Sequence, residues 1–276
     1  MKMRNMVLIA RKDLTEVLRN KAAVIPMIVL PLIFVILMPV IMIVAMQSSP
    51  QTAQAMTADP DIQVFLTNLP EATQVNLAGM TGEQSALVLV LGMMMAPMFL
   101  ILPLMFASII AAESFAGEFE RKTMEALLYT PASDWELFFG KVLAGFLPSV
   151  LITWVSFLVY TIILNWLSFP IFHSIWFPLD SWWPLIFWVS PAISLMSVSF
   201  TVLISAKLKN FMGTYQMSGS LVLIVVALFI GQMTGLIYLS VLVGIIVGFI
   251  CWIFAAVFLY MAVHFFNRQK LLLDII

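Results

Sequence analysis

AAESFAGEFERKTMEALLYTPASDWELFFGK, residues Ala111 to Lys141, is the longest densely charged stretch of the sequence. Nine of these residues are Asp, Glu, Lys or Arg, whereas these four types make up 10% of the 276-residue chain. Long apolar runs precede and follow the stretch. A charged passage between two such runs indicates a loop at a membrane surface.

The local pattern predicts a helix, a stop and a second helix. Apolar and small residues recur at helical spacing from Phe119 to Leu127, which predicts a short amphipathic helix. Thr130 precedes Pro131, and the residue before a proline is pushed out of the helical region, so this helix must end there. Ser133 and Glu136 have the spacing of a capping box, which predicts that a new helix begins directly after Ser133.

The composition indicates an all-α integral membrane protein. Hydrophobic residues make up 63% of the chain and the mean hydropathy is +1.08. A net charge of -1 gives no reason to expect a nucleic-acid partner. The single Cys251 permits neither a disulfide nor a cysteine metal site within one chain, and two histidines are too few for histidine-rich metal catalysis.

Six apolar runs are long enough to cross a bilayer, and one amphipathic helix precedes them within a single transmembrane domain, residues 1–276. The spans are predicted at about 24–46, 87–112, 142–165, 184–206, 216–233 and 239–265. Residues 2–21 are predicted to form a helix that lies in the headgroup plane as an elbow before span one. Its polar face carries Arg11, Lys12, Asp13, Glu16 and Arg19. A signal peptide is the competing interpretation, but the apolar run is far longer than a signal core.

The basic residues predict the orientation. All 13 Lys and Arg residues fall before span one, between spans two and three, between spans four and five, or after span six. The positive-inside rule therefore places both termini and the loop 113–141 in the cytoplasm, with the protein in the cytoplasmic membrane. The loop 47–86 is predicted to be extracytoplasmic, and its residues Ile62 to Leu69 predict a short amphipathic helix.

The sequence contains no sign of an energy source or a catalytic site of its own. No charged residue lies deep inside a predicted span, although ion-coupled transporters usually carry such groups. Gly140-Lys141 continues into Val142, so it is not a phosphate-binding loop. No Ser/His/Asp set can be assembled, and no metal-ligating or substrate-binding residues can be identified. A membrane body driven from outside through its charged loop is the interpretation that remains.

The loop resembles the signature cytoplasmic loop of type 2 ATP-binding-cassette (ABC) exporter permeases. In that family a Glu-Arg-Lys-Thr-x-Glu core, here Glu120 to Glu125, is followed by Leu-Leu-x-Thr-Pro, here Leu127 to Pro131, and by Glu-Leu-x-x-Gly-Lys, here Glu136 to Lys141. The N-terminal segment from Arg11 to Leu32 is similar to the family's elbow helix running into span one, and Ala206 to Phe211 resembles its second cytoplasmic loop.

The resemblance implies the permease subunit of an ABC exporter, without cofactors of its own. A separate ATPase subunit would bind ATP and Mg and dock on the coupling helix from Glu118 to Leu128, while a second permease chain would pair with this one in the lipid. Carried over by position, the residues that face or brace the ATPase are Glu118, Glu120, Arg121, Lys122, Thr123 and Glu125. The sodium or drug-efflux branch of bacteria and archaea is the most similar. In this chain the segment between spans five and six is only Met233 to Leu239, and the longer members of that branch have a longer segment there.

The resemblance also implies a mechanism, and two other functions remain open. ATP binding would close the ATPase dimer, the coupling helices would move with it, and spans one, two and five would rearrange to release substrate outward. One alternative is a membrane scaffold or sensor subunit that transports nothing. The other is a membrane-embedded enzyme acting on lipid, which would need a polar catalytic cluster at one depth.

Overall fold

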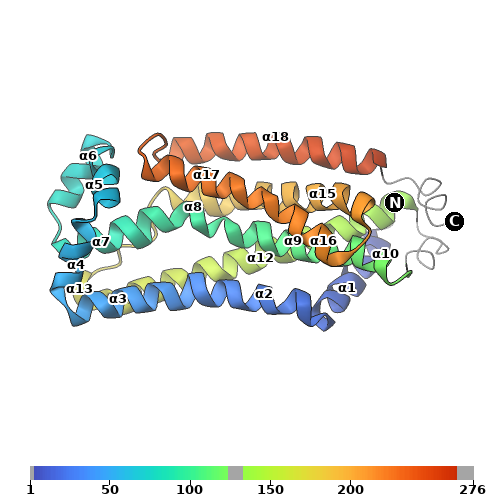
Figure 1. The fold of residues 1–276 in the computed structure, drawn as a ribbon, viewed down its shortest axis with the longest axis horizontal. Coiled ribbons are helices and arrows are strands. Elements are labelled where there is room, and N and C mark those ends of the chain that lie inside the picture. Colours follow the sequence, from blue (N-terminus) through green and yellow to red (C-terminus); the bar gives the residue numbers. More distant parts are fainter. Residues whose placement is uncertain (1–2, 124–132, 266–276) are drawn as a thin grey trace.

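The computed structural model describes residues 3–123 and 133–265 (Figure 1). These residues form helices and no strand, and six helical stretches are long and apolar enough to cross a membrane. The spans, numbered one to six, are Lys21–Ser48, Gly82–Glu120, Trp135–Leu167, Trp182–Leu208, Phe211–Met233 and Val241–His264. The six predicted spans and the all-α membrane fold class are confirmed.

Several spans are built from consecutive helical segments. Span one comprises α2 (Lys21–Pro31), η1 (Leu32–Leu37) and α3 (Met38–Ser48), and α1 (Met3–Arg19) precedes it. Span two comprises α7 (Gly82–Leu87), η2 (Val88–Met94), α8 (Met95–Phe99), α9 (Ile101–Ala112), η3 (Glu113–Gly117) and α10 (Glu118–Glu120). Span three is α12 (Asp134–Leu167); span four comprises α14 (Trp182–Pro184), η4 (Leu185–Val189) and α15 (Ser190–Leu208). Span five comprises α16 (Phe211–Ser218), η5 (Gly219–Leu221) and α17 (Val222–Met233), and span six is α18 (Val241–Phe265). Outside the spans lie α4 (Pro50–Thr57), α5 (Pro60–Thr67), α6 (Glu71–Ala78) and α13 (Phe169–Phe172).

Spans two and four form the centre of the bundle. Over its most apolar 18 residues span two is 89% buried and span four 78%, whereas spans one and six are 22% buried. Aromatic side chains fill the centre, and Trp182 stacks on Phe157 and Tyr160. The indole of Trp182 donates to the Gly92 carbonyl at 2.6 Å, in the π-helical η2, where backbone carbonyls lose their regular partners.

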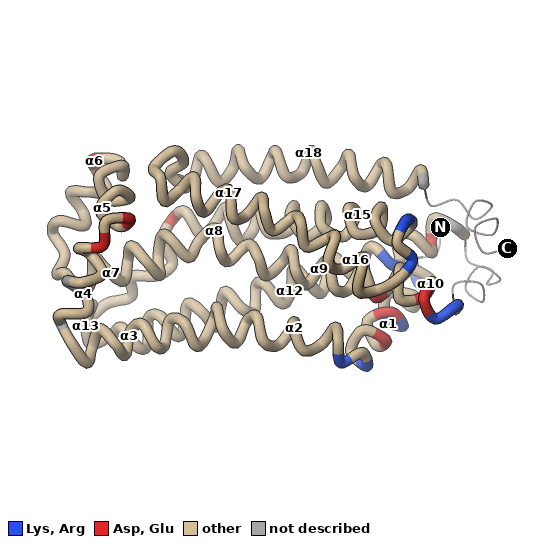
Figure 2. Tube along the Cα trace, viewed as in Figure 1, with Lys and Arg blue, Asp and Glu red and all other residues tan. Residues whose placement is uncertain are grey.

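Charge is segregated to the two ends of the bundle (Figure 2). We call the end with α1, α10 and the start of α16 the basic end, because every Lys and Arg of the described residues lies there. The opposite end, with α4 to α7 and α13, carries carboxylates and, within the described residues, no Lys or Arg; we call it the acidic end.

The acidic end is covered by short helices. The predicted helix at Ile62 to Leu69 is present as α5, with Phe65 and Leu69 buried against the bundle. Residues 234–240, between α17 and α18, contain no helix. The short segment between spans five and six therefore holds no re-entrant helix pair.

The charged stretch differs in part from its prediction. The capping box is confirmed: Ser133 Oγ accepts from the Glu136 N–H at 3.2 Å while the Glu136 carboxylate accepts from the Ser133 N–H, and α12 begins there. The expected coupling helix, Glu118 to Leu128, is wrong at its start, because Glu118–Glu120 is the last turn of span two and the chain then leaves the helix. The rest of that helix, residues 124–132 with Glu125, lies outside the described residues.

A Schellman motif explains why span two ends where it does. Lys122 adopts the left-handed conformation with φ 57°, its N–H donates to the Phe119 carbonyl at 3.1 Å, and the Thr123 N–H donates to the Glu118 carbonyl at 3.0 Å. These bonds satisfy carbonyls that a helix end leaves unpaired. Span two is longer than the predicted 87–112, since Glu113 and Glu118 continue the helix instead of ending it.

Candidate functional site

Three chain segments converge at the basic end: α1, the last turns of span two, and the start of α12. Helix α1 crosses α12 closely at Gly140, where a Cβ atom would lie 3.0 Å from Ile9 Cβ and 3.1 Å from the Met6 carbonyl oxygen. Only glycine fits this approach without displacing α1. Asn5 Nδ2 donates to the Glu136 carboxylate at 3.1 Å and links the same two helices.

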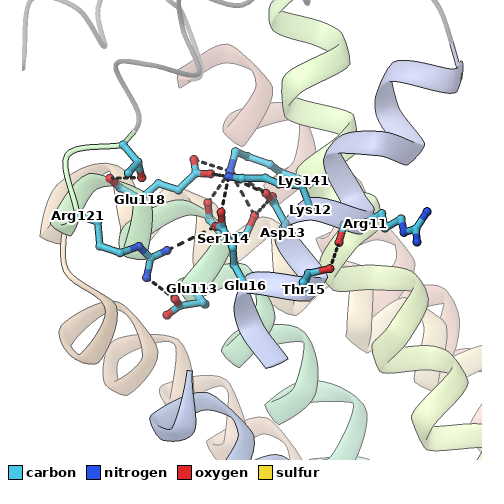
Figure 3. Close-up of polar contacts among 11 residues, drawn as sticks. Arg11, Lys12, Asp13, Thr15, Glu16, Glu113, Ser114, Glu118, Arg121 and Lys141 are labelled. Atoms are coloured by element: carbon cyan, nitrogen blue, oxygen red, sulfur yellow. Dashed lines mark hydrogen bonds and ion pairs between the residues drawn. The ribbon is translucent and has the colours of Figure 1, made fainter. Parts of the chain in front are cut away.

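Lys141 is the centre of the convergence (Figure 3). Its side chain is 0% exposed, and its Nζ lies 2.7 Å from Glu118 Oε2 and 3.2 Å from Asp13 Oδ2. It also donates to the Ser114 carbonyl at 2.6 Å, while the Ser114 hydroxyl donates to Asp13 Oδ2. The ammonium lies 5.3 Å from the centroid of the Phe115 ring, a favourable cation–π position. One buried cation thus joins α1, span two and span three.

Lys12 lies on the solvent side of the cluster and is a second cation that pairs with its carboxylates. Its Nζ contacts Glu118 Oε1, Asp13 Oδ1 at 3.4 Å and Glu16 Oε1 at 3.2 Å. Partial burial alone would lower the pKa of the Lys12 ammonium, but the carboxylates of Glu118, Asp13 and Glu16 outweigh burial and raise its pKa. Two ammonium groups therefore share two buried carboxylates, and these four charges sum to zero.

A second ion pair lies one helical turn away. Arg121 Nη1 bonds to Glu113 Oε1, and Glu113 Oε2 accepts from Asn20 Nδ2 at 2.7 Å. Burial tends to lower the pKa of Arg121, but its hydrogen bond and ion pair with Glu113 prevail and raise it. Gly117 lies between the pair on the same helix face, where a Cβ atom would meet Glu113 Oε2 at 3.1 Å and Arg121 Nη2 at 3.2 Å. Because glycine has no Cβ atom, the side chains of Glu113 and Arg121 can meet across this position.

The network does not have the features of a metal or catalytic centre. Carboxylate oxygens of Asp13, Glu16 and Glu118 come close together, but the ammonium of Lys12 contacts all three and takes the position of a cation between them. The Ser114 hydroxyl donates to the Asp13 carboxylate, but both residues are buried, away from any substrate. Its physical role is to hold three helices together, because separating them would leave buried charges unpaired.

The sequence-predicted site residues divide into three groups. Those inside the network are Glu118, Arg121, Lys12, Asp13 and Glu16. Those exposed are Glu120 at the end of span two, Lys122 and Thr123 on the loop, and Arg11 and Arg19 on α1. Glu125 lies outside the described residues. Glu118 is fully buried, so it braces the loop from within and does not face a partner.

Glu120 has a partner that the sequence did not indicate. Its carboxylate accepts from the Phe211 N–H at 2.8 Å, at the first turn of α16, where the helix dipole favours a negative charge. Asn210 caps the same helix by accepting from the Gly213 N–H at 2.7 Å. The end of span two is therefore also tied to the start of span five.

Sequence reasoning missed Lys141, Glu113 and Ser114 as site residues. One available signal was the spacing of Glu113, Gly117 and Arg121 at four-residue steps, which places them on one helix face. Another was the position of Asp13 on the buried face of α1. It lies seven residues after Met6 and four before Val17, the two apolar residues that α1 buries.

The fold and this site define a multi-pass, all-helical membrane protein whose first amphipathic helix is ion-paired to the loop between spans two and three. The chain belongs to the ABC-2 family transporter proteins, whose family model matches residues 7–242. The match extends from α1 to the start of span six, and it confirms the family indicated by the sequence. No match was found among curated proteins or among solved structures. Membership makes the chain a membrane component of a transporter, and the sodium or drug-efflux branch stays a prediction.

Proposed function

We propose that this chain is the permease subunit of an ATP-driven exporter and that a separate ATPase subunit docks on its basic end. The observation that carries the proposal is the buried Lys141 network, which fixes α1, span two and span three to one another beside the loop 121–133. A force applied to that loop is transmitted to all three elements together, because moving one alone would break buried ion pairs. ATP and Mg are bound by the partner.

The basic end is proposed to face the cytoplasm. All described Lys and Arg residues lie there, and the positive-inside rule assigns such an end to the cytoplasmic side. Span two has 39 residues, about 58 Å of helix, against about 30 Å of hydrocarbon. Its charged last turns can therefore extend beyond the hydrocarbon toward a soluble ATPase.

Pairing with a second permease chain is part of the proposal. Spans one and five leave large apolar side chains exposed on the single chain, among them Ile25, Ile28, Leu223 and Ile230. Lipid or a second copy covers these faces in a membrane. Closure of the ATPase dimer would then move the two basic ends, and substrate would leave at the acidic ends.

Co-purification with a candidate ATPase subunit tests the docking site. The variant is Lys122→Glu with Glu125→Arg, because Lys122 is exposed and has no ion pair among the described residues. Glu120 and Arg121 stay unchanged, since both hold internal contacts. The matched control is Glu71→Lys, a charge reversal at the acidic end.

Loss of the ATPase from the loop variant, with the control still binding, is the expected result. Equal capture by the loop variant and wild type would refute docking on this loop. If wild type captured no ATPase from detergent or from native membranes, the scaffold or sensor alternative would replace the exporter.

Orientation is tested separately by cysteine labelling. In a Cys251→Ser background, we expect Lys122→Cys to react with a membrane-impermeant maleimide only after the cells are opened. Glu71→Cys should react on intact cells, because it lies at the acidic end. The reverse pattern would contradict the proposed orientation.

A further inference from the structure

A cavity of about 350 Å³ opens at the acidic end, far from the ion network. It lies between η2 and α8 of span two, the end of α17 and the start of α18, with α6 and the segment before α14 completing its wall. Its volume is within the range of small-molecule binding sites.

Gln232 gives the cavity an unsatisfied acceptor. The side chain is 2% exposed, and its Nε2 donates to the Met93 carbonyl at 3.0 Å, which fixes the orientation of the amide. Its Oε1 is buried and accepts no hydrogen bond from any described residue, and Gln232 is among the residues that line the cavity. Buried amide oxygens are normally paired, so this atom is suited to accept from a group that enters the cavity.

The remaining polar groups in the wall favour a cation. Asp180 lines the cavity and is exposed to solvent. No Lys or Arg lies at this end in the described part of the chain, and the neighbouring helices add further carboxylates. Anions are therefore repelled, and a positively charged group is attracted.

Part of the cavity wall is apolar. Leu77, Val88 and Leu179 line it, while Tyr238 supplies a hydroxyl that is hydrogen-bonded to Thr73 Oγ1 at 3.2 Å. This bond also ties α6 to the segment between spans five and six, so the wall is held in place. An apolar body fits against these side chains while its charged end meets Gln232 or Asp180.

We propose that this cavity is a binding site for a lipophilic ammonium compound, whose N–H donates to Gln232 Oε1 and whose charge is balanced by Asp180. The inference goes beyond the proposed function, because binding to the cavity requires no ATPase and can be measured on the chain alone.

The test uses the full-length chain in detergent and the fluorescent primary amine monodansylcadaverine. Saturable binding is expected at neutral pH, with dissociation constants about tenfold higher for Gln232→Met and for Asp180→Asn, the effect of losing one charge-assisted contact. Asp61→Asn, which removes a carboxylate at the same end outside the cavity, should bind as wild type does.

A second probe separates charge from hydrophobic partition. The carboxylate analogue dansyl-aminohexanoate should bind at least tenfold more weakly than the amine, and equal affinity would overturn the proposal. Binding of the amine unchanged in both variants would also overturn it, as would the absence of saturable binding. Asp180 is exposed, so Asp180→Asn remains a fair test even if Gln232→Met lowers the thermal stability.

Discussion

Lys141→Met removes the buried cation that joins α1 to spans two and three. The side chains of Lys141 and Asp13 are 0% exposed and that of Glu118 is 1% exposed, so the carboxylates cannot turn to water. Removing one partner of a buried ion pair costs about 3 to 5 kcal/mol. Lys12 still contacts both carboxylates, which places the expected loss near the lower value, about 3 kcal/mol.

The assay is thermal unfolding of the purified chain in detergent. A loss of about 3 kcal/mol corresponds to a fall in the midpoint of about 6 to 12 °C for a chain of this size. The matched control is Lys207→Met, an exposed lysine at the same end, which should change stability by less than about 0.5 kcal/mol.

The decisive comparison adds Glu118→Gln. Alone, Glu118→Gln leaves an excess positive charge and should also cost about 3 kcal/mol. In Lys141→Met it restores neutrality, because Lys12 then balances Asp13, so the double variant should be no less stable than either single variant. A double variant that loses the sum of the two, about 6 kcal/mol, would show two independent effects and refute the shared network.

Two further predictions concern the edge of the network. Gly117→Ala should lower the unfolding midpoint, because overpacking against Glu113 and Arg121 costs about 1 to 3 kcal/mol and exceeds the gain in helix propensity. In a background with both Glu113→Ala and Arg121→Ala, where the close contacts are gone, the same change should stabilise by about 0.5 to 1 kcal/mol, and destabilisation in both backgrounds would contradict the close contact. The pKa of Lys12 is raised in the folded state, so its contribution to stability is fully present below its unfolded pKa and is lost as the pH rises through its folded pKa. Thermal midpoints should therefore show no loss from Lys12 below about pH 10. Above that pH the wild type should lose stability more steeply than Lys12→Met, and parallel profiles would refute the assignment.

Local and one-dimensional signals predicted much of this structure. The apolar runs located six spans, since the need for about 20 apolar residues is set by the bilayer and not by neighbouring helices. The Ser133 capping box fixed the start of α12, because both of its hydrogen bonds join residues three apart in the sequence. The C-terminal end predicted for span two was less accurate, because a charged residue ends a helix only where no partner within the fold neutralises its charge. Glu113 and Glu118 both have such partners, and the helix continues through them.

The ion network could not be derived in the same way. Glu118 lies 105 residues after Asp13 in the chain, and Lys141 lies 128 residues after Asp13. Each alone has the appearance of an ordinary surface charge near the end of a helix. What buries them is the approach of α1 to α12 at Gly140, a tertiary contact of backbone against side chain.

The same reasoning explains why the predicted docking residues divide as they do. A charge that pairs inside the protein cannot also be the group that recognises a partner, since exposing it would leave a buried charge unbalanced. Glu118 is therefore a positioning residue, Arg121 is held by Glu113 although its side chain is 42% exposed, and Glu120 holds the start of α16. Under the proposed function, recognition would be left to exposed groups such as Lys122, whose left-handed backbone turns the chain away from the helix axis of span two just where the loop begins.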